Sequence, residues 1–177
     1  MKKSNKSRRN FIKNGILASS LTIIPRNVLG GVGFISPSDQ LNIASIGAGG
    51  KGRSDILNAS VNGRERVIAL CDIDKNGKHG VLSSRKKFSK ANFYFDFRKL
   101  LDKEKDLDAI TISTPDHTHA SIAMEAMERG IHVYIQKPLT HNIKEARLLT
   151  EKARELKIVT QMGNQGASNP SQIKVKE

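Results

Sequence analysis

The residues best suited to chemistry lie in a short glycine-rich stretch and at one aspartate beyond it. Gly47, Gly49 and Gly52 fit the pattern G-x-G-x-x-G within GAGGKG. The first glycine of this pattern permits a tight turn, the second lets a pyrophosphate approach the backbone, and the third lets a helix pack closely on a strand. Asp72 follows twenty residues after Gly52, where an acidic side chain can bind the ribose hydroxyls of a dinucleotide. These residues predict a dinucleotide-binding site.

The same residues favour one of the two nicotinamide dinucleotides. A carboxylate at Asp72 would repel a 2′-phosphate, which favours NAD, while Lys75 nearby keeps NADP as the alternative. Lys51 adds positive charge beside the phosphates. A glycine turn that binds nothing is the competing interpretation. The cofactor-binding residues predicted in this part of the chain are Gly47, Ala48, Gly49, Gly50, Lys51, Gly52, Asp72 and Ile73.

Three further segments with unusual residues follow predicted strands. They are Thr114–His119 (TPDHTH), Gln136–Pro138 (QKP) and Gly163–Gly166 (GNQG). Ligands of an open α/β sheet bind outside the carboxyl ends of its strands. All three segments are therefore expected at the same edge as the glycine-rich turn.

The elements that must position these residues alternate along the chain. Apolar runs predict strands, and the segments between them have helical spacing, as in Ala120, Ala123, Met124 and Met127. Continuous apolar runs are typical of parallel strands covered on both faces. We expect an α/β fold, a doubly wound parallel sheet (Rossmann) of about six strands with helices on both faces. The strands are predicted at 41–46, 66–71, 92–95, 107–113, 131–136 and 158–162, and the helices at 50–61, 75–89, 98–105, 116–129 and 143–156.

The motifs GAGGKG, TPDHTH and QKP, in this order, resemble those of the Gfo/Idh/MocA oxidoreductases over about residues 41–166. That family joins a Rossmann domain to a larger α/β domain and transfers hydride between NAD(P) and a sugar or polyol carbon. The resemblance implies that Lys137 relays the substrate's proton near the nicotinamide, a role suited to a partly desolvated amine. It also implies that Thr114, Pro115 and His119 line the nicotinamide end and that Asn164 lies near the same ring. Lys137 and His119 are the catalytic residues implied, and both also belong to the implied cofactor site.

Two positions depart from the family pattern. Gln136 replaces the glutamate of the family's E-K-P motif, which removes a negative neighbour of Lys137, and Ala167 stands where relatives often carry histidine. Some family members are glycosidases that use NAD transiently, and this activity is one alternative. A second alternative is a non-catalytic NAD-binding module or the product of a decayed gene.

No metal site is predicted. His117 and His119 could form a metal-binding pair with Asp116, but no third or fourth ligand is evident. Asp116 is instead expected to cap a helix, with His117 facing solvent. Cys71 is the only cysteine, which excludes an intrachain disulfide, and we expect it to be an apolar filler of a buried strand.

The 177 residues carry a formal net charge of +13. Residues 1–40 hold seven Lys or Arg residues and one Asp, so +6 of the excess lies there. A nucleic-acid binder is the rival class, prompted by this charge and by the basic run at Arg85–Lys90. That run is expected to be the solvated end of a helix, and no aromatic platform or recognition motif accompanies it. We therefore predict no nucleic-acid partner.

The N-terminal charge belongs to a segment that resembles an export signal. Ser7–Lys13 (SRRNFIK) is similar to the twin-arginine motif, and the apolar run 15–24 follows it. This run is too short for a membrane-spanning helix, which needs about 20 residues. We expect residues 1–30 to be a twin-arginine signal, 31–40 to be a linker, and the twin-arginine machinery to export the protein to the periplasm.

Residues 41–166 are expected to form the NAD(P)-binding Rossmann domain, and residues 167–177 the truncated start of the next element. The family's second domain, which covers the sugar and supplies the dimer surface, is expected to be missing. The chain is therefore predicted to turn over a sugar or polyol poorly alone, and to form a homo-oligomer only with that domain. A fragment, a frameshift and a decayed gene are the three explanations considered.

Overall fold

The structure of the protein is a computed structural model that describes residues 35–77 and 79–167, apart from the side chain of Asn62. The described residues fall into two units, which divide between Asp39 and Gln40. The described part of the first unit contains a short 3-10 helix, η1 (Pro37–Asp39). The predicted signal at 1–30, the first part of the predicted linker and residues 168–177 lie outside the described residues.

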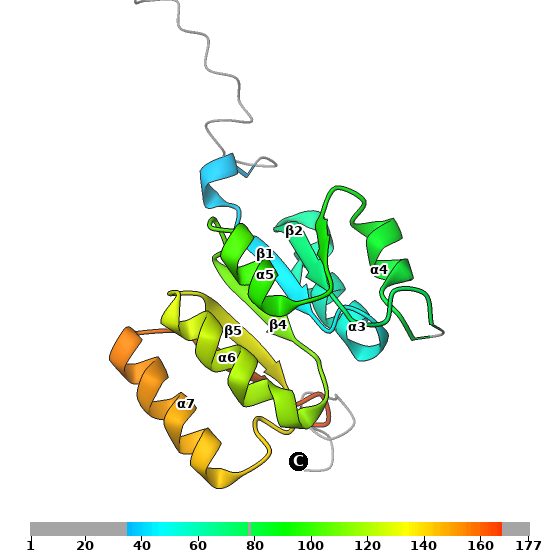
Figure 1. Ribbon diagram of the computed structural model, residues 1–177. Coiled ribbons are helices and arrows are strands. Elements are labelled where there is room, and N and C mark those ends of the chain that lie inside the picture. Colours follow the sequence, from blue (N-terminus) through cyan, green and yellow to red (C-terminus); the bar gives the residue numbers. More distant parts are fainter. Residues whose placement is uncertain (1–34, 78, 168–177) are drawn as a thin grey trace, which may run out of the picture. The chain divides into compact units, whose positions relative to one another are not determined.

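The second unit is built on a six-stranded sheet whose strands are all parallel (Figure 1). The strand order is β3-β2-β1-β4-β5-β6. This order confirms the predicted doubly wound Rossmann sheet, in which the chain reverses its direction of travel between β1 and β4. The strands are β1 (Asn42–Ile46), β2 (Arg66–Cys71), β3 (Asn92–Tyr94), β4 (Ala109–Ile112), β5 (His132–Gln136) and β6 (Thr160–Gly163).

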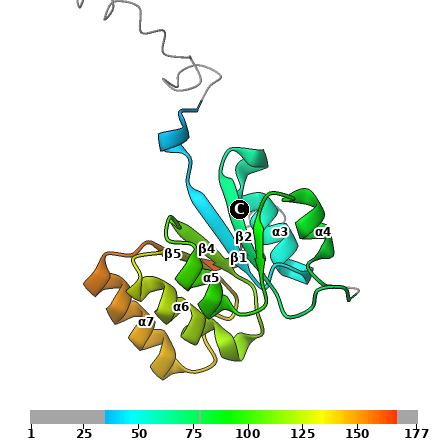
Figure 2. The same cartoon turned by 45° about the horizontal axis from the view of Figure 1, so that its top comes forward.

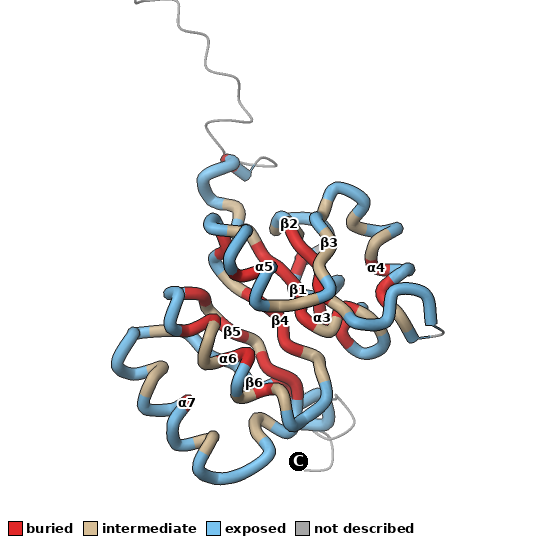
Figure 3. The backbone as a smooth tube through the Cα atoms, in the orientation of Figure 1, coloured by how far each residue is buried: buried red, intermediate tan, exposed pale blue. Residues whose placement is uncertain are grey.

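Helices cover both faces of the sheet, as Figures 1 and 2 show from two directions. On one face, Ile56 and Val81 pack with Leu70 of β2. On the other face, Leu100, Met127 and other buried residues pack with the strands. Buried stretches run through β1, β2, β4 and β5 in Figure 3, because helices cover the middle of the parallel sheet on both faces. The helices are α3 (Gly50–Ala59) and α4 (Leu82–Lys87) on the first face, and α5 (Phe97–Lys103), α6 (His119–Glu128) and α7 (Ile143–Leu156) on the second.

One predicted helix is much shorter than expected. The pattern predicts a helix over 75–89, but α4 begins only at Leu82. The carboxylate of Asp74 accepts a hydrogen bond from the N–H of Gly77 at 2.6 Å, and the N–H of Gly80 donates to the carbonyl of Gly77. These turns stop a helix from starting there, because an Asp side chain competes with the backbone for its hydrogen bonds.

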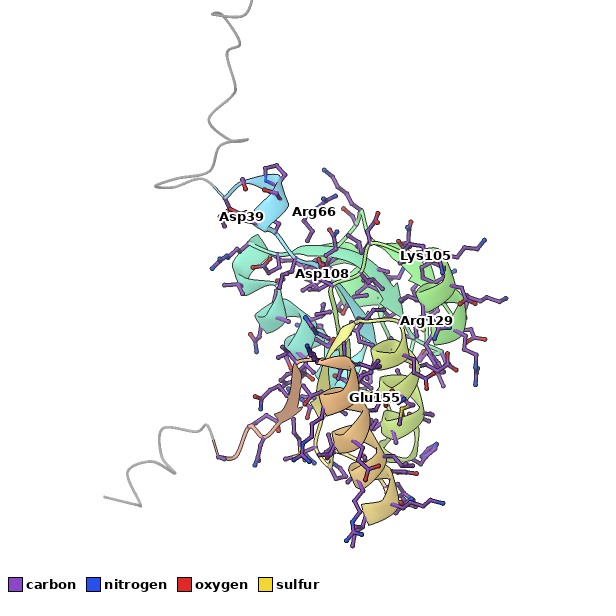
Figure 4. The ribbon with its side chains drawn as sticks, turned by 90° about the vertical axis from the view of Figure 1, so that its left-hand side faces the viewer. Asp39, Arg66, Lys105, Asp108, Arg129 and Glu155 are labelled. Carbon is purple, nitrogen blue, oxygen red and sulfur yellow. The ribbon has the colours of Figure 1, made fainter. Side chains whose placement is uncertain are left out.

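The edge where the strands begin is tied together by structural contacts. Asp108, labelled in Figure 4, accepts a hydrogen bond from the backbone N–H of Asn42 at 2.7 Å. Arg129, also labelled, forms ion pairs with Asp102 of α5 and Glu125 of α6, both at 3.1 Å. In the part of the chain that the structure describes, no helix is long and apolar enough to span a bilayer.

Candidate functional site

A cavity of about 760 Å³ opens at the carboxyl edge of the sheet, beside the point where the strand order reverses. Turns that follow β1, β2, β3 and β4 line it. Ligand pockets commonly enclose about 300–1,000 Å³, so the volume suits a nucleotide-sized ligand. The predicted residues that line it are Gly47, Gly49, Gly50, Lys51, Asp72, Ile73, Thr114 and Pro115.

The glycine-rich turn is held by hydrogen bonds from its own backbone. The N–H groups of Gly47 and Ala48 both donate to the carbonyl of Cys71, at 2.9 and 3.2 Å. The N–H of Gly49 donates to Oδ2 of Asp72 at 2.8 Å. The N–H of Gly50 donates to the carbonyl of His79 at 2.7 Å. The turn is thereby fixed to the end of β2 and to the loop that follows β2.

Two glycines of the motif have the predicted roles: Gly47 permits the tight turn, and Gly52 permits the close packing of α3 on the strand before it. Gly47 has a φ of +77°, a conformation that favours glycine. A Cβ at Gly52 would lie 1.7 Å from the carbonyl oxygen of Gly47, so only glycine lets α3 begin so close to β1. At Gly49, a Cβ would lie 2.3 Å from the carbonyl oxygen of His79. The chain's own loop therefore already requires glycine at 49, independently of a pyrophosphate.

The first turn of α3 and the Asp72 carboxylate lie together at the cavity. The residue before α3, Gly49, makes no side-chain capping bond, so the positive end of the helix dipole faces the cavity without a capping side chain. Asp72 accepts from Gly49 through Oδ2 and from the N–H of Asp74 through Oδ1, at 2.8 and 2.9 Å. Each carboxylate oxygen has a second lone pair, which leaves Asp72 able to accept from ribose hydroxyls. The site thus fits a dinucleotide by its helix end, its acidic residue and its volume.

Cys71 also lines the cavity, at the end of β2. Burial raises the pKa of its thiol to about 12, and the nearby carboxylates of Asp72 and Asp96 add to the rise. The thiol is therefore protonated and uncharged at neutral pH, and it is a weak nucleophile. This agrees with the expectation that Cys71 acts as a small apolar residue.

The TPDHTH segment divides between the cavity and the protein interior. Thr114, Pro115, His117 and Thr118 line the cavity, and His117 is exposed, as expected. His119 is fully buried, and its Nδ1 and Nε2 each lie 2.8 Å from a carbonyl oxygen, those of Pro138 and Thr114. Its ring therefore links two loops beneath the cavity and does not face into it.

Lys137 and Asn164 lie farther along the same edge, after β5 and β6, and both are exposed. Neither is among the described residues that line the cavity, and the same holds for Ala48, Gly52 and His119. Lys137 is joined to Pro138 by a cis peptide bond. Its backbone N–H donates to Oε1 of Gln136 at 3.3 Å.

Several lining residues were not predicted from the sequence. Phe95, Asp96, Phe97 and Arg98 follow β3 and line the cavity, as does His79. The guanidinium of Arg98 lies 4.7 Å from the centre of the Phe97 ring. The topology offers a signal for them, since β3 neighbours β2 and its carboxyl end must lie beside Asp72. Among the described residues, no group of three His, Cys, Asp or Glu side chains could hold a metal ion.

Comparisons with known proteins agree with this geometry. A family model described as "Oxidoreductase family, NAD-binding Rossmann fold" matches residues 41–164. The chain is 31% identical over 143 residues to "Glycosyl hydrolase family 109 protein 1" of Shewanella sp. (strain ANA-3), covering 77% of this chain and 31% of that protein. It is 29% identical over 143 residues to "Inositol 2-dehydrogenase" of Rubrobacter xylanophilus, covering 79% of this chain and 40% of that protein. The chain thus spans about a third of the length of the curated relatives it matches.

Two solved structures show the same fold. Myo-inositol 2-dehydrogenase from Lactobacillus plantarum superposes with a TM-score of 0.66 at 23% identity, covering 77% of this chain and 40% of that one. The WlbA dehydrogenase of Chromobacterium violaceum, solved with NADH and UDP-GlcNAcA, gives a TM-score of 0.66 at 21% identity, covering 77% and 39%. At this identity the agreement concerns the arrangement of the sheet and helices.

Proposed function

The chain belongs to the Gfo/Idh/MocA oxidoreductase family with its NAD-binding Rossmann fold, and from that premise we propose that it binds NAD for hydride transfer to or from a sugar or polyol carbon. The observation that carries the proposal is the cavity at the carboxyl edge, where the start of α3, which no side chain caps, and the Asp72 carboxylate lie side by side. A dehydrogenase of inositol among the relatives supports the substrate class.

The cofactor would be held by neighbouring groups of this cavity. The first turn of α3 would receive the pyrophosphate, because N–H groups and the helix dipole favour an anion there. Asp72 would accept hydrogen bonds from the ribose hydroxyls. The exposed apolar side chains of Ile73 and Phe95, which both line the cavity, offer surface for the adenine ring.

Lys137 is the residue proposed to handle the substrate's proton. NAD would supply, when bound, the acceptor for the hydride that leaves the carbinol carbon. The hydroxyl must then lose its proton as the carbonyl forms, and a neutral amine at Lys137 can take that proton. In the reverse direction its ammonium form returns the proton to the new hydroxyl. His119 would act by holding the Thr114 and Pro138 carbonyls, since its ring nitrogens face both of them.

The preference for NAD over NADP is proposed from the carboxylate of Asp72, and it can be tested by calorimetric titration with NADH and NADPH. The native chain should bind NADH more tightly than NADPH. Asp72→Asn should weaken NADH binding about tenfold to hundredfold, because a charged hydrogen-bond acceptor is lost. It should also make the affinities for NADH and NADPH more nearly equal.

Asp106→Asn is the matched control, because Asp106 lies before β4 at the opposite edge, where its backbone carbonyl accepts from the side chain of Asn42. The substitution leaves that carbonyl in place and should leave both affinities unchanged. An absence of NADH binding at millimolar concentrations would rule out the cofactor proposal. Equal affinity for the two cofactors would rule out the preference alone.

Transient oxidation during glycoside cleavage is the second candidate function, favoured by the relatives named "Glycosyl hydrolase family 109". We infer that either activity is weak in the 177 residues alone, because the family match covers the NAD-binding part, residues 41–164. Release of p-nitrophenol from p-nitrophenyl glycosides, dependent on NAD but without net NADH formation, would identify the hydrolase. Net NADH formation with polyols would identify the dehydrogenase.

A further inference from the structure

Asp55 of α3 is a buried carboxylate with partners from three different parts of the fold. Its side chain is 3% exposed and is ion-paired through Oδ1 with the amine of Lys51, one turn earlier in the helix. Its Oδ2 accepts hydrogen bonds from Oγ of Ser113 and from Nε2 of Gln136, both at 2.8 Å. Ser113 and Gln136 lie at the carboxyl ends of β4 and β5. Asp55 thus joins the helix of the glycine-rich turn to the edge of the sheet that carries Lys137.

The second half of this network passes through the amide of Gln136. Its Oε1 accepts from Nε2 of Gln165 at 2.9 Å and from the backbone N–H of Lys137 at 3.3 Å. Gln136 is 5% exposed, so its own amide is shielded from water. Gly163 leaves room for it, since a Cβ there would lie 2.9 Å from Nε2 of Gln136.

The identity of these partners determines which way the Gln136 amide points. An ionised carboxylate only accepts hydrogen bonds, so the NH₂ of Gln136 must face Asp55. The amide oxygen must then face the N–H of Lys137 and the NH₂ of Gln165, which only donate. Every group is satisfied in this orientation, and reversing the amide would oppose donors to donors at both ends.

We propose that Asp55 is a positioning residue, which orients the Gln136 amide and thereby holds the backbone of Lys137 and the turn after β6. The link to catalysis rests on the proposed function, in which Lys137 handles the substrate's proton. Gln136 stands where the family motif has glutamate. In this chain the carboxylate is instead that of Asp55, which is hydrogen-bonded to the Gln136 amide. Asp55 itself is not among the residues that line the cavity, because it acts through Gln136.

Asp55→Asn should reverse this orientation. The ammonium of Lys51 attracts a carbonyl oxygen and repels an NH₂ group, which favours the new amide nitrogen where Oδ2 was. That nitrogen opposes the NH₂ of Gln136, which must turn its oxygen inward and present its NH₂ to Lys137 and Gln165. We expect amide hydrogen exchange at Lys137 and in residues 163–166 to speed up about fivefold to tenfold, the equivalent of one hydrogen bond.

Gln136→Glu should perturb the same groups for a different reason, because two carboxylates would then compete for one proton. The double variant Asp55→Asn/Gln136→Glu should restore the pattern. The amide introduced at position 55 can donate to one oxygen of the carboxylate introduced at position 136, while the other oxygen accepts from Lys137 and Gln165. Exchange at Lys137 and 163–166 should return to within about twofold of the native rate.

The experiment is amide exchange followed by NMR on the full chain without cofactor. Ile112, fully buried in β4, reports on global opening and should be unaffected in all variants. Ser113→Ala is the matched control, because it removes a hydrogen bond to the same Oδ2 without opposing the Gln136 amide. It should leave exchange at Lys137 unchanged.

The positioning role would be established if amide exchange at Lys137 and 163–166 is faster in both single variants and returns to the native rate in the double variant. Unchanged exchange at Lys137 and 163–166 in Asp55→Asn would overturn it. Equal acceleration at Ile112, or a double variant no slower than the singles, would also overturn it, because these results indicate a general structural role. NADH titration of the native chain is a separate measurement, so failure of the proposed function can be told from failure of this proposal.

Discussion

At the scale of single residues, His119 shows how a conspicuous side chain can serve the scaffold. It is fully buried, and both ring nitrogens lie 2.8 Å from carbonyl oxygens of separate loops. Each carbonyl oxygen is a hydrogen-bond acceptor that a ring N–H can satisfy. The loops before α6 and after β5, which carry Thr114 and Lys137, are thereby joined through one imidazole.

His119→Phe should therefore lower the free energy of unfolding. The variant keeps a ring of similar size but removes the imidazole contacts to the carbonyl oxygens of Thr114 and Pro138, which costs about 1 to 3 kcal/mol. Denaturant unfolding followed by circular dichroism measures this. His117→Phe, at an exposed position two residues earlier, should change stability by less than about 0.5 kcal/mol. A loss below about 1 kcal/mol in His119→Phe would contradict the role given to the ring.

Site residues that belong to a motif of fixed local spacing could be predicted from the sequence. A contact between side chains that are distant in the sequence could not. Gly47, Gly52 and Asp72 follow a local spacing that indicates a turn and a strand end. Asp55 and Gln136 are 81 positions apart, and only the packing of α3 against β1 and β4 brings them together. No periodicity within either segment carries that information.

At the scale of elements, α3 depends on close contact with the strand before it. A Cβ at Gly52 would meet the backbone carbonyl of Gly47 at 1.7 Å, and a backbone atom cannot swing aside as a flexible side chain can. The start of α3, with the turn that precedes it, must therefore move to accept any larger residue.

Gly52→Ala should destabilise the chain by about 2 to 4 kcal/mol through this overlap, and should weaken NADH binding by shifting the turn. Gly166→Ala is its control, because nothing lies within 4 Å of the Cβ that it would add. Thermal unfolding and NADH titration of both variants provide the comparison. Equal stability of the two variants would mean that the turn tolerates a side chain at 52.

Helix bounds were predictable where the capping residues are local. The predicted helix 143–156 matches α7, whose first turn is closed by Asn142 accepting from the N–H of Glu145 and by Glu145 accepting from the N–H of His141, both at 3.0 Å. The predicted helix 75–89 was wrong over its first half. Its helical spacing gave no sign that Asp74 would bind the N–H of Gly77 and form a turn instead.

At the scale of the whole molecule, the basic N-terminal segment bears on where the protein is located in the cell. Because Ser7–Lys13 (SRRNFIK) resembles the twin-arginine motif and an apolar run follows it in this basic segment, we propose that residues 1–40 direct export by the twin-arginine route. Residues 1–40 fused to a folded fluorescent protein should deliver it to the bacterial periplasm. Replacing Arg8 and Arg9 together by Lys keeps the charge and should retain the reporter in the cytoplasm. Equal export of both fusions would show that the paired arginines are not recognised.

The hydrogen bonds of the glycine-rich turn bear on how a ligand would enter. The N–H groups of Gly47, Ala48, Gly49 and Gly50 already donate to the chain's own acceptors, so the turn is ordered when the protein folds. Association then needs little further loss of backbone entropy at this point. We therefore expect the association rate to be limited by diffusion and orientation, with no slow rearrangement of the turn visible in stopped-flow traces.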